Sequence, residues 1–186
     1  MNSFRGFSLL ELLITLAIIA IVVCFAIPDL SGALQSNAGE IEVNNLARSM
    51  HYARSAAISS GRMVTVCRSK NGDTCGGEWQ QGILVFTDTN ADHVFNAEDQ
   101  TLRYIQTIDP VGTLSMSSFP NRQYLQFTPM GSTNQQSGNF TWCPPGNDKE
   151  LARQLIFTHT GRTRFARDGD GDGVREGANG NALNCD

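Results

Sequence analysis

One carboxylate stands alone in a long apolar segment near the start of the chain. Between Phe7 and Ile27 the only ionisable side chain is Glu11. The segment has about the 20 residues that a helix needs, at roughly 1.5 Å per residue, to cross a bilayer. A charge in hydrocarbon is costly, so it marks a site with a specific partner. A cut after Gly6 would create an amino group at Phe7, about one helical turn from the Glu11 carboxylate.

Arginines occupy alternate positions in the segment that begins at Gly161. Arg162 and Arg164 are two residues apart, and Arg167 follows three residues later. On an extended strand, side chains at i and i+2 project to the same face, roughly 6–7 Å apart. Two guanidinium groups at that spacing can contact neighbouring phosphates, which predicts a DNA contact. The alternative is that these arginines are solvated and pair with the aspartates that follow them.

Carboxylates alternate with glycines in the next segment, at Asp168, Asp170 and Asp172. This alternation is typical of a Ca²⁺-binding loop, and Ca²⁺ is the one cofactor that the sequence predicts. The twelfth position of the loop is Asn179 instead of a bidentate Glu, so a flexible acidic turn is the alternative.

No arrangement of residues predicts an enzyme. The three histidines, His51, His93 and His159, belong to unrelated elements, and the serines lack a nucleophile elbow. The run Asp88-x-Asn90-x-Asp92 also has the spacing of metal ligands, but His93 stands where a calcium loop requires glycine. We therefore interpret this run as the tip of a β-hairpin.

The elements that position these groups begin with a long helix. Apolar residues recur at alternating spacings of three and four, at Val43, Leu46, Met50, Ala53 and Ala57. We expect one helix from about Phe7 to about Ser59, kinked at Pro28. Residues 7–27 would span the membrane, and residues 28–60 would pack their apolar stripe on a sheet.

After Gly61 the pattern becomes that of short strands separated by Gly, Pro, Asn and Asp turns. A helix followed by strands predicts an α+β domain, with a small, mostly antiparallel sheet packed on the helix. We place this β-rich domain at residues 61–167, a Gly/Asp-rich tail at residues 168–186 and a polar loop at residues 132–138. The strand candidates are residues 63–67, 82–86, 101–105, 124–127 and 154–157.

Length and charge limit the possible architectures and partners. The 186 residues leave room for one membrane helix and one domain of modest size. The net charge of -4 argues against a coat of nucleic acid over the whole surface. Arg5 lies on the short side of the apolar segment, so the positive-inside rule places residues 1–6 in the cytoplasm and the domain outside it.

Four cysteines lie in the domain that we expect outside the cytoplasm, where disulfides persist. Three pairings are possible. We favour Cys67–Cys75, which closes a short polar turn, and Cys143–Cys185, which ties down the tail. A zinc site is the alternative, although no Cys-x-x-Cys or paired His spacing supports it.

The start of the chain resembles the signal of type IV pilins and type II secretion pseudopilins. The resemblance is carried by Arg5-Gly6-Phe7-Ser8-Leu9-Leu10-Glu11, where the glycine precedes the apolar segment instead of following it. It implies that prepilin peptidase removes residues 1–6 as a leader, cutting after Gly6, and that Phe7 is then N-methylated. It also implies that Glu11 pairs with the Phe7 ammonium of a neighbour during assembly, and that the fold is pilin-like.

Two further segments resemble the GspH, FimT and FimU proteins, namely residues 53–58 and residues 79–88. This resemblance implies a minor pilin near the filament tip that aids assembly, with other minor and major pilins as partners. The protein would cross the inner membrane once before assembly, with its domain in the periplasm, and would then be extracellular in the pilus. A GspH-like pseudopilin of type II secretion is the alternative. The Gly-Arg-x-Arg pattern resembles the element through which FimT-type pilins bind DNA, which implies the same role for Arg162 and Arg164, with Arg167 as a further candidate.

Overall fold

The computed structural model describes residues 7–107 and 110–185, and for residues 24–31 it describes the backbone only. The chain begins with one helix, α1 (Leu9–Ser60), and a short 3-10 helix, η1 (Trp79–Gln81), precedes the second strand. It divides into two compact units, residues 1–35 and residues 36–186. The described strands are β1 (Val64–Arg68), β2 (Gly82–Thr87), β3 (Gln100–Gln106), β4 (Thr113–Phe119), β5 (Tyr124–Phe127), β6 (Ser137–Cys143), β7 (Arg153–Phe157) and β8 (Thr163–Phe165).

The first unit is the initial part of α1. Its side chains are exposed from Phe7 through Val23, and apart from Glu11 none of them is ionisable. A search of the described residues finds no helix whose apolar stretch is long enough for a membrane crossing. The predicted span at residues 7–27 and the predicted kink at Pro28 both include residues whose side chains lie outside the description, and they stay predictions.

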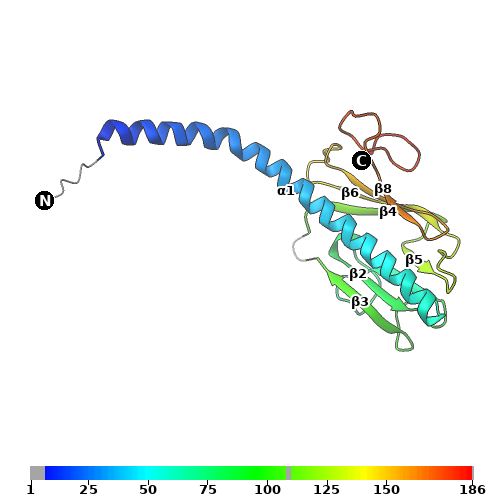
Figure 1. The fold of residues 1–186 in the computed structure, drawn as a ribbon. Helices are drawn as coiled ribbons and strands as arrows, with labels where there is room; N and C mark the ends of the chain where they lie inside the picture. Colours follow the sequence, from blue (N-terminus) through cyan, green and yellow to red (C-terminus); the bar gives the residue numbers. More distant parts are fainter. Residues whose placement is uncertain (1–6, 108–109, 186) are drawn as a thin grey trace. The chain divides into compact units, whose positions relative to one another are not determined.

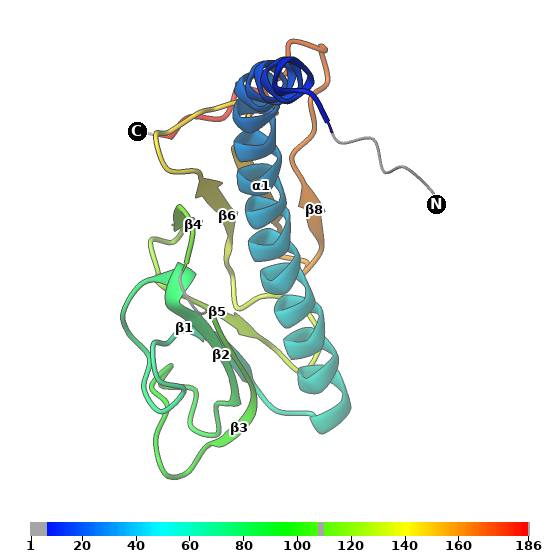
Figure 2. The same cartoon turned by 90° about the vertical axis from the view of Figure 1, so that its left-hand side faces the viewer.

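The second unit contains two antiparallel sheets packed with the rest of α1 (Figures 1 and 2). One sheet has the strand order β3-β2-β1-β5, and the other has the order β4-β6-β7-β8. The α+β class and the antiparallel pairing are confirmed. The expectation of a single sheet is wrong, because the chain leaves the first sheet after β3 and returns to it with β5, after β4 has begun the second sheet.

The predicted apolar stripe of α1 forms the middle of the core. Val43, Leu46, Met50, Ala53 and Ala57 are each at most 1% exposed, and they cluster with strand residues of both sheets. Burial of each large side chain stabilises the folded chain by about 1.5–3 kcal/mol. Because this one face of α1 contacts residues of both sheets, its burial holds the two sheets together. Gly39 adds a close approach, since a Cβ there would lie 2.5 Å from the ring of Trp142. This contact explains a glycine inside a helix, where it costs about 1 kcal/mol relative to alanine.

A buried arginine connects the second sheet to the helix. Arg153 Nε donates to Glu40 Oε1 at 3.1 Å, and its Nη2 donates to Ser36 Oγ at 2.7 Å. Burial and the nearby Arg175 lower the pKa of Arg153, while the hydrogen bond to Glu40 opposes that shift. The ion pair therefore links β7 directly to α1, and the half-exposed Glu40 side chain limits what the pair adds to stability.

Two disulfides close the loops of the second unit. They join Cys67 to Cys75 and Cys143 to Cys185, which are the two pairings favoured from the sequence. The second bridge packs in a small apolar cluster with Ala152, Ala166 and Leu183. The tail is therefore held at its end by a covalent bond and along its length by apolar contacts.

The five strand candidates agree with β1, β2, β3, β5 and β7 to within one residue at each end. The candidates omitted β4, β6 and β8, and the loop assigned to residues 132–138 overlaps the start of β6. Three of the seven residues of β4 are Ser, and β6 begins with Ser-Gly-Asn, and these residue types are common in turns. Pairing across the second sheet, along all seven residues of β4, overrides that preference.

Candidate functional site

Ser8 and Glu11 form a reciprocal cap at the start of α1. Glu11 N donates to Ser8 Oγ at 3.2 Å, and Ser8 N donates to Glu11 Oε2 at 3.1 Å. Such a capping box satisfies two backbone donors that the first helical turn leaves free. Phe7 is 85% exposed, whereas the predicted cleavage residue Gly6 lies outside the described residues. Glu11 thus has a local role in its own chain besides the role predicted for it between chains.

The two predicted DNA-contacting arginines share one face of the second sheet. Arg162 immediately precedes β8, Arg164 lies within it, and both are exposed. Thr163 points the other way, because its Oγ1 lies 3.2 Å from His51 Nε2 on α1. Alternation along the strand therefore turns Arg162 and Arg164 away from the helix.

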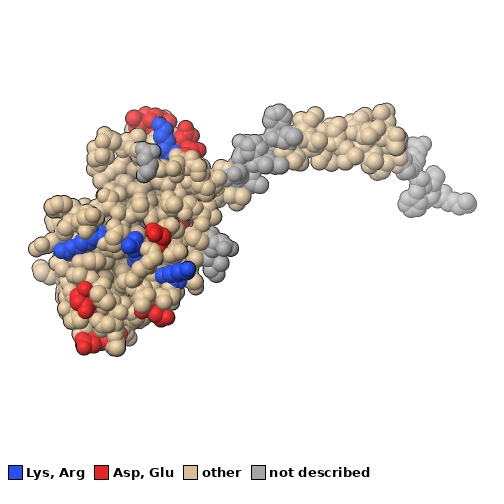
Figure 3. All heavy atoms as spheres, turned by 180° about the vertical axis from the view of Figure 1, so that it is seen from behind, with Lys and Arg blue, Asp and Glu red and all other residues tan. Residues whose placement is uncertain are grey.

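Arg162, Arg164 and Arg167 form no ion pair with the described residues, 7–107 and 110–185, so the alternative pairing with the aspartates is absent there. On the face drawn in Figure 3, Lys and Arg side chains lie singly among acidic ones and form no broad basic patch. On that face (Figure 3), a contact with DNA would therefore depend on a few basic side chains.

Gly161, the glycine of this pattern, is required by packing. Its φ is +76°, and a Cβ there would lie 2.3 Å from the carbonyl oxygen of Gly131. Arg54 on α1 also donates from Nη1 to the Gly161 oxygen at 3.1 Å. The turn before Arg162 is therefore pressed against both a neighbouring loop and the helix, and a side chain does not fit.

We expect Gly161→Ala to lower the free energy of unfolding by about 1–3 kcal/mol from backbone strain, with a further loss from the clash. Gly146→Ala is the matched control, since Gly146 has φ +87° but nothing within 4 Å of a Cβ. Urea unfolding of both variants checks this. Equal losses in the two variants would contradict a role for the Gly131 contact.

Four carboxylates gather in the tail. One oxygen from each of Asp168, Asp170, Asp172 and Glu176 lies within 4.8 Å of the others. Glu176 was missed from the sequence, although it is the ninth position of a loop counted from Asp168, where calcium loops often place a ligand. Asp168 Oδ1 already accepts from Gly171 N at 2.7 Å, and Glu176 Oε2 accepts from Gly169 N at 2.6 Å. Hydrogen bonds from backbone N–H groups already hold these carboxylates in the loop without a metal ion. The binding of Ca²⁺ therefore stays a prediction.

The other acidic run has a structural role. Asp88 begins the connection between the paired strands β2 and β3, as expected for a hairpin, but it is only 1% exposed. Its Oδ2 accepts hydrogen bonds from Thr65 Oγ1 and Gln126 Nε2, each at 2.7 Å. Asp88 therefore connects the hairpin to the core of the first sheet. The spacing of Asp88 and Asn90 in the sequence did not predict that Asp88 is buried.

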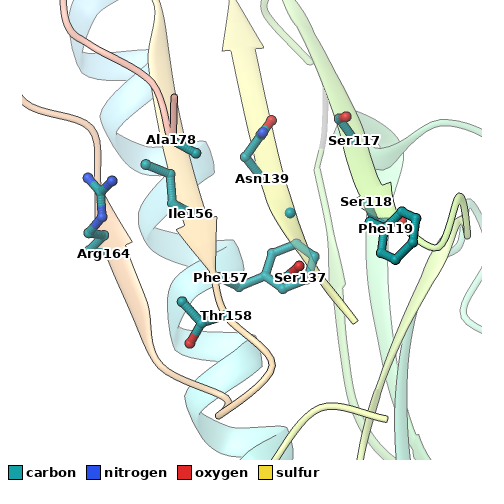
Figure 4. A pocket seen from close by; sticks show the side chains of 11 residues that line it. Ser117, Ser118, Phe119, Ser137, Asn139, Ile156, Phe157, Thr158, Arg164 and Ala178 are labelled. Carbon is teal, nitrogen blue, oxygen red and sulfur yellow. The ribbon is translucent and has the colours of Figure 1, made fainter. Parts of the chain in front are cut away.

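A trough crosses the outward face of the second sheet. It has a volume of about 490 Å³, and Figure 4 shows Asn139, Ile156 and Arg164 projecting along it from β6, β7 and β8. A second cavity of about 300 Å³ adjoins it beneath the tail and shares Asn139 and Ala178. No motif in the sequence pointed to either cavity, because their linings come from four strands and the tail.

Comparison with known proteins gives two family matches. The family described as "Type II transport protein GspH" matches residues 42–161, and the "Prokaryotic N-terminal methylation motif" matches residues 1–26. No curated protein sequence matches the chain.

Two crystal structures of the Pseudomonas aeruginosa type IV minor pilin FimU have a similar fold. The first shares 21% identity over 69% of this chain and 92% of that one, with a TM-score of 0.51. The second shares 20% identity over 70% and 90% of the two chains, with a TM-score of 0.55.

Proposed function

The chain belongs to the GspH family of pilins and pseudopilins, and on that premise we propose that it is a minor, tip-associated subunit of a type IV pilus. Members of this family are structural subunits of filaments and not enzymes. The observation that carries the proposal is Glu11 at the start of α1, in a segment that matches the N-terminal methylation motif. When subunits leave the membrane and assemble, a lone carboxylate at this position can form an ion pair with the terminal amine of a neighbouring chain.

In this proposal the chain is first a membrane-inserted precursor. Residues 1–6 face the cytoplasm, residues 7–27 cross the inner membrane, and residues 61–186 lie in the periplasm. Prepilin peptidase cuts after Gly6 and methylates the amine of Phe7, and the helix then packs with other minor and major pilins. The two disulfides suit this route, because the periplasm is oxidising.

A GspH-like pseudopilin of type II secretion is the alternative, and the description of the matching family favours it. The pilus is supported by the name of the structural neighbour, a type IV minor pilin, and by the two covalent closures, which suit a domain exposed outside the cell. Deletion of the gene separates the two. Loss of twitching motility with normal protein secretion supports the pilus, whereas lost secretion with normal twitching contradicts it.

DNA uptake is a second candidate function. It is favoured by Arg162 and Arg164, which project to one face of the second sheet with no ion pair among the described residues. Each phosphate that an arginine neutralises releases counterions, so such a contact has a signature in the salt dependence of binding.

We expect the double variant Arg162→Gln, Arg164→Gln to weaken binding to duplex DNA and to reduce the slope of log affinity against log salt by about 1.8, or about 0.9 for each phosphate that an arginine no longer neutralises. The control is Arg62→Gln, Lys70→Gln, which removes the same charge from exposed positions elsewhere. Fluorescence anisotropy at several salt concentrations measures both slopes. If the two double variants have the same slope, the arginines of β8 are not the DNA contact.

A further inference from the structure

The cavity beneath the tail is lined by amides. We call it the tail pocket; it lies between the outward face of β6 and β7 and the loop of residues 177–184, and its volume is about 300 Å³. None of the described residues that line it is ionisable. Its polar groups therefore suit a neutral ligand that forms several hydrogen bonds.

A chain of hydrogen bonds fixes the orientation of two amides on the floor of the tail pocket. Gln154 Nε2 donates to Thr141 Oγ1 at 2.9 Å, and Thr141 Oγ1 donates in turn to Asn139 Oδ1 at 3.3 Å. The acceptor Gln154 Oε1 and the donor Asn139 Nδ2 remain available. Gln154 is only 8% exposed, and its Oε1 is buried with no hydrogen-bond partner among the described residues. Buried polar atoms in native proteins nearly always have a partner, so this acceptor indicates a ligand.

Gly177 leaves room beside that acceptor. A Cβ at this position would lie 3.1 Å from Gln154 Oε1 and 3.4 Å from Asn179 Oδ1. The backbone at Gly177 does not have the positive φ that would itself require glycine. The absence of a side chain therefore avoids crowding of the Gln154 amide oxygen, and the backbone conformation of the loop does not itself require glycine there.

We propose that the tail pocket binds a pyranose sugar. Each sugar hydroxyl is both donor and acceptor, so neighbouring hydroxyls match the Gln154 acceptor and the Asn139 donor. Leu183 and Ala182 provide the apolar wall that the C–H face of a pyranose needs. The volume is at the small end of the range for ligand sites, which suits a single sugar ring.

The adjoining trough gives room for further sugar units. It continues from Asn139 and Ala178 towards Phe119, whose ring is 79% exposed at the end of β4. An exposed aromatic ring is a platform for the apolar face of a sugar, and Arg164 lines the same trough, where its N–H groups can donate to sugar hydroxyls. A glycan chain can therefore lie across the second sheet with one terminal unit in the tail pocket.

The test is a titration of the full chain in micelles of a zwitterionic detergent, because glucoside and maltoside detergents would compete for the tail pocket. The probes are glucose, galactose, mannose and N-acetylglucosamine at millimolar concentration. We expect at least one of them to shift the NMR signals of the Asn139 and Gln154 side-chain amides. Gln154→Met removes the acceptor at similar length, and it should weaken that sugar about tenfold, the usual effect of removing one hydrogen bond in a buried site.

A second variant keeps the test decisive if Gln154→Met fails to fold. Gly177→Ala leaves the amides intact, adds one methyl group beside the acceptor and should also weaken the sugar. Gln106→Met, an exposed amide on β3, should bind like the unaltered chain. The proposal is overturned if none of the four sugars shifts these signals, if both pocket variants bind normally, or if an oligodeoxynucleotide shifts the signals while no sugar does.

Discussion

Replacement of Glu11 by alanine is expected to leave cleavage after Gly6 intact and to exclude the chain from assembled filaments. Once the helix packs among other subunits, Glu11 and the Phe7 ammonium of a neighbour form an ion pair in apolar surroundings. Removal of one partner of such a pair costs about 3–5 kcal/mol, because the other charge is left without compensation. At about 1.4 kcal/mol per tenfold, incorporation should fall at least a hundredfold.

Glu11 also caps its own helix, and this local role could produce a defect without any pairing between chains. Loss of a helix cap costs only about 1 kcal/mol, which is too little to exclude a subunit from a filament. Glu11→Gln separates the two roles, since glutamine completes a capping box but carries no charge. We therefore expect Glu11→Gln to be excluded as strongly as Glu11→Ala.

Quantitative mass spectrometry of sheared filaments and of membranes measures incorporation, and the mass of the first peptide reports cleavage and methylation. If Glu11→Gln enters filaments normally while Glu11→Ala does not, the cap alone explains the requirement for Glu11. The proposed ion pair between Glu11 and the Phe7 ammonium of a neighbouring chain would then be wrong. Glu11 would then no longer support the proposal that the chain is a filament subunit.

Removal of the Cys143–Cys185 bridge is expected to cost more stability than removal of the Cys67–Cys75 bridge. The bridge spans 42 residues, and the chain-entropy relation assigns about 4 kcal/mol to a closed loop of that length. The Cys67–Cys75 bridge spans only 8 residues, for which the same relation gives about 2.5 kcal/mol. We therefore expect the double alanine variant of Cys143 and Cys185 to lose more unfolding free energy than that of Cys67 and Cys75.

Urea unfolding followed by tryptophan fluorescence measures both losses, because Trp79 and Trp142 are buried in the second unit. Limited proteolysis provides an independent readout. Without the Cys143–Cys185 bridge the tail should be cut first, near Gly173 and Gly180, and the tail pocket should lose its sugar. A larger loss from the Cys67–Cys75 variant would show that the tail bridge stabilises little.

Much of the fold was predictable because local patterns reported it. The stripe from Val43 to Ala57 has the period of a helix, and the candidates for β1, β2 and β5 are apolar runs between turn residues. The two bridges were predictable because the first closes a short turn and the second ends a tail with few other anchors. Each of these inferences depends only on residues that are close in the sequence, or on which loop a disulfide would close.

The second sheet was harder to predict from the sequence, because polar residues in β4 and β6 make these segments resemble loops. Their pairing is decided by contacts between distant segments, and the ion pair of Arg153 with Glu40 is likewise separated by 113 residues. The same holds for the buried carboxylate of Asp88, whose partners Thr65 and Gln126 come from other strands.

By itself, the sequence determined the helix, its lone carboxylate and the family to which the chain belongs, because these are written in continuous runs of residues. Only the tertiary structure decided which way Arg162 and Arg164 face, and which amide oxygen in the tail pocket has no hydrogen-bond partner among the described residues. Those properties depend on how strands and tail meet in space, and packing between segments far apart in the chain sets them.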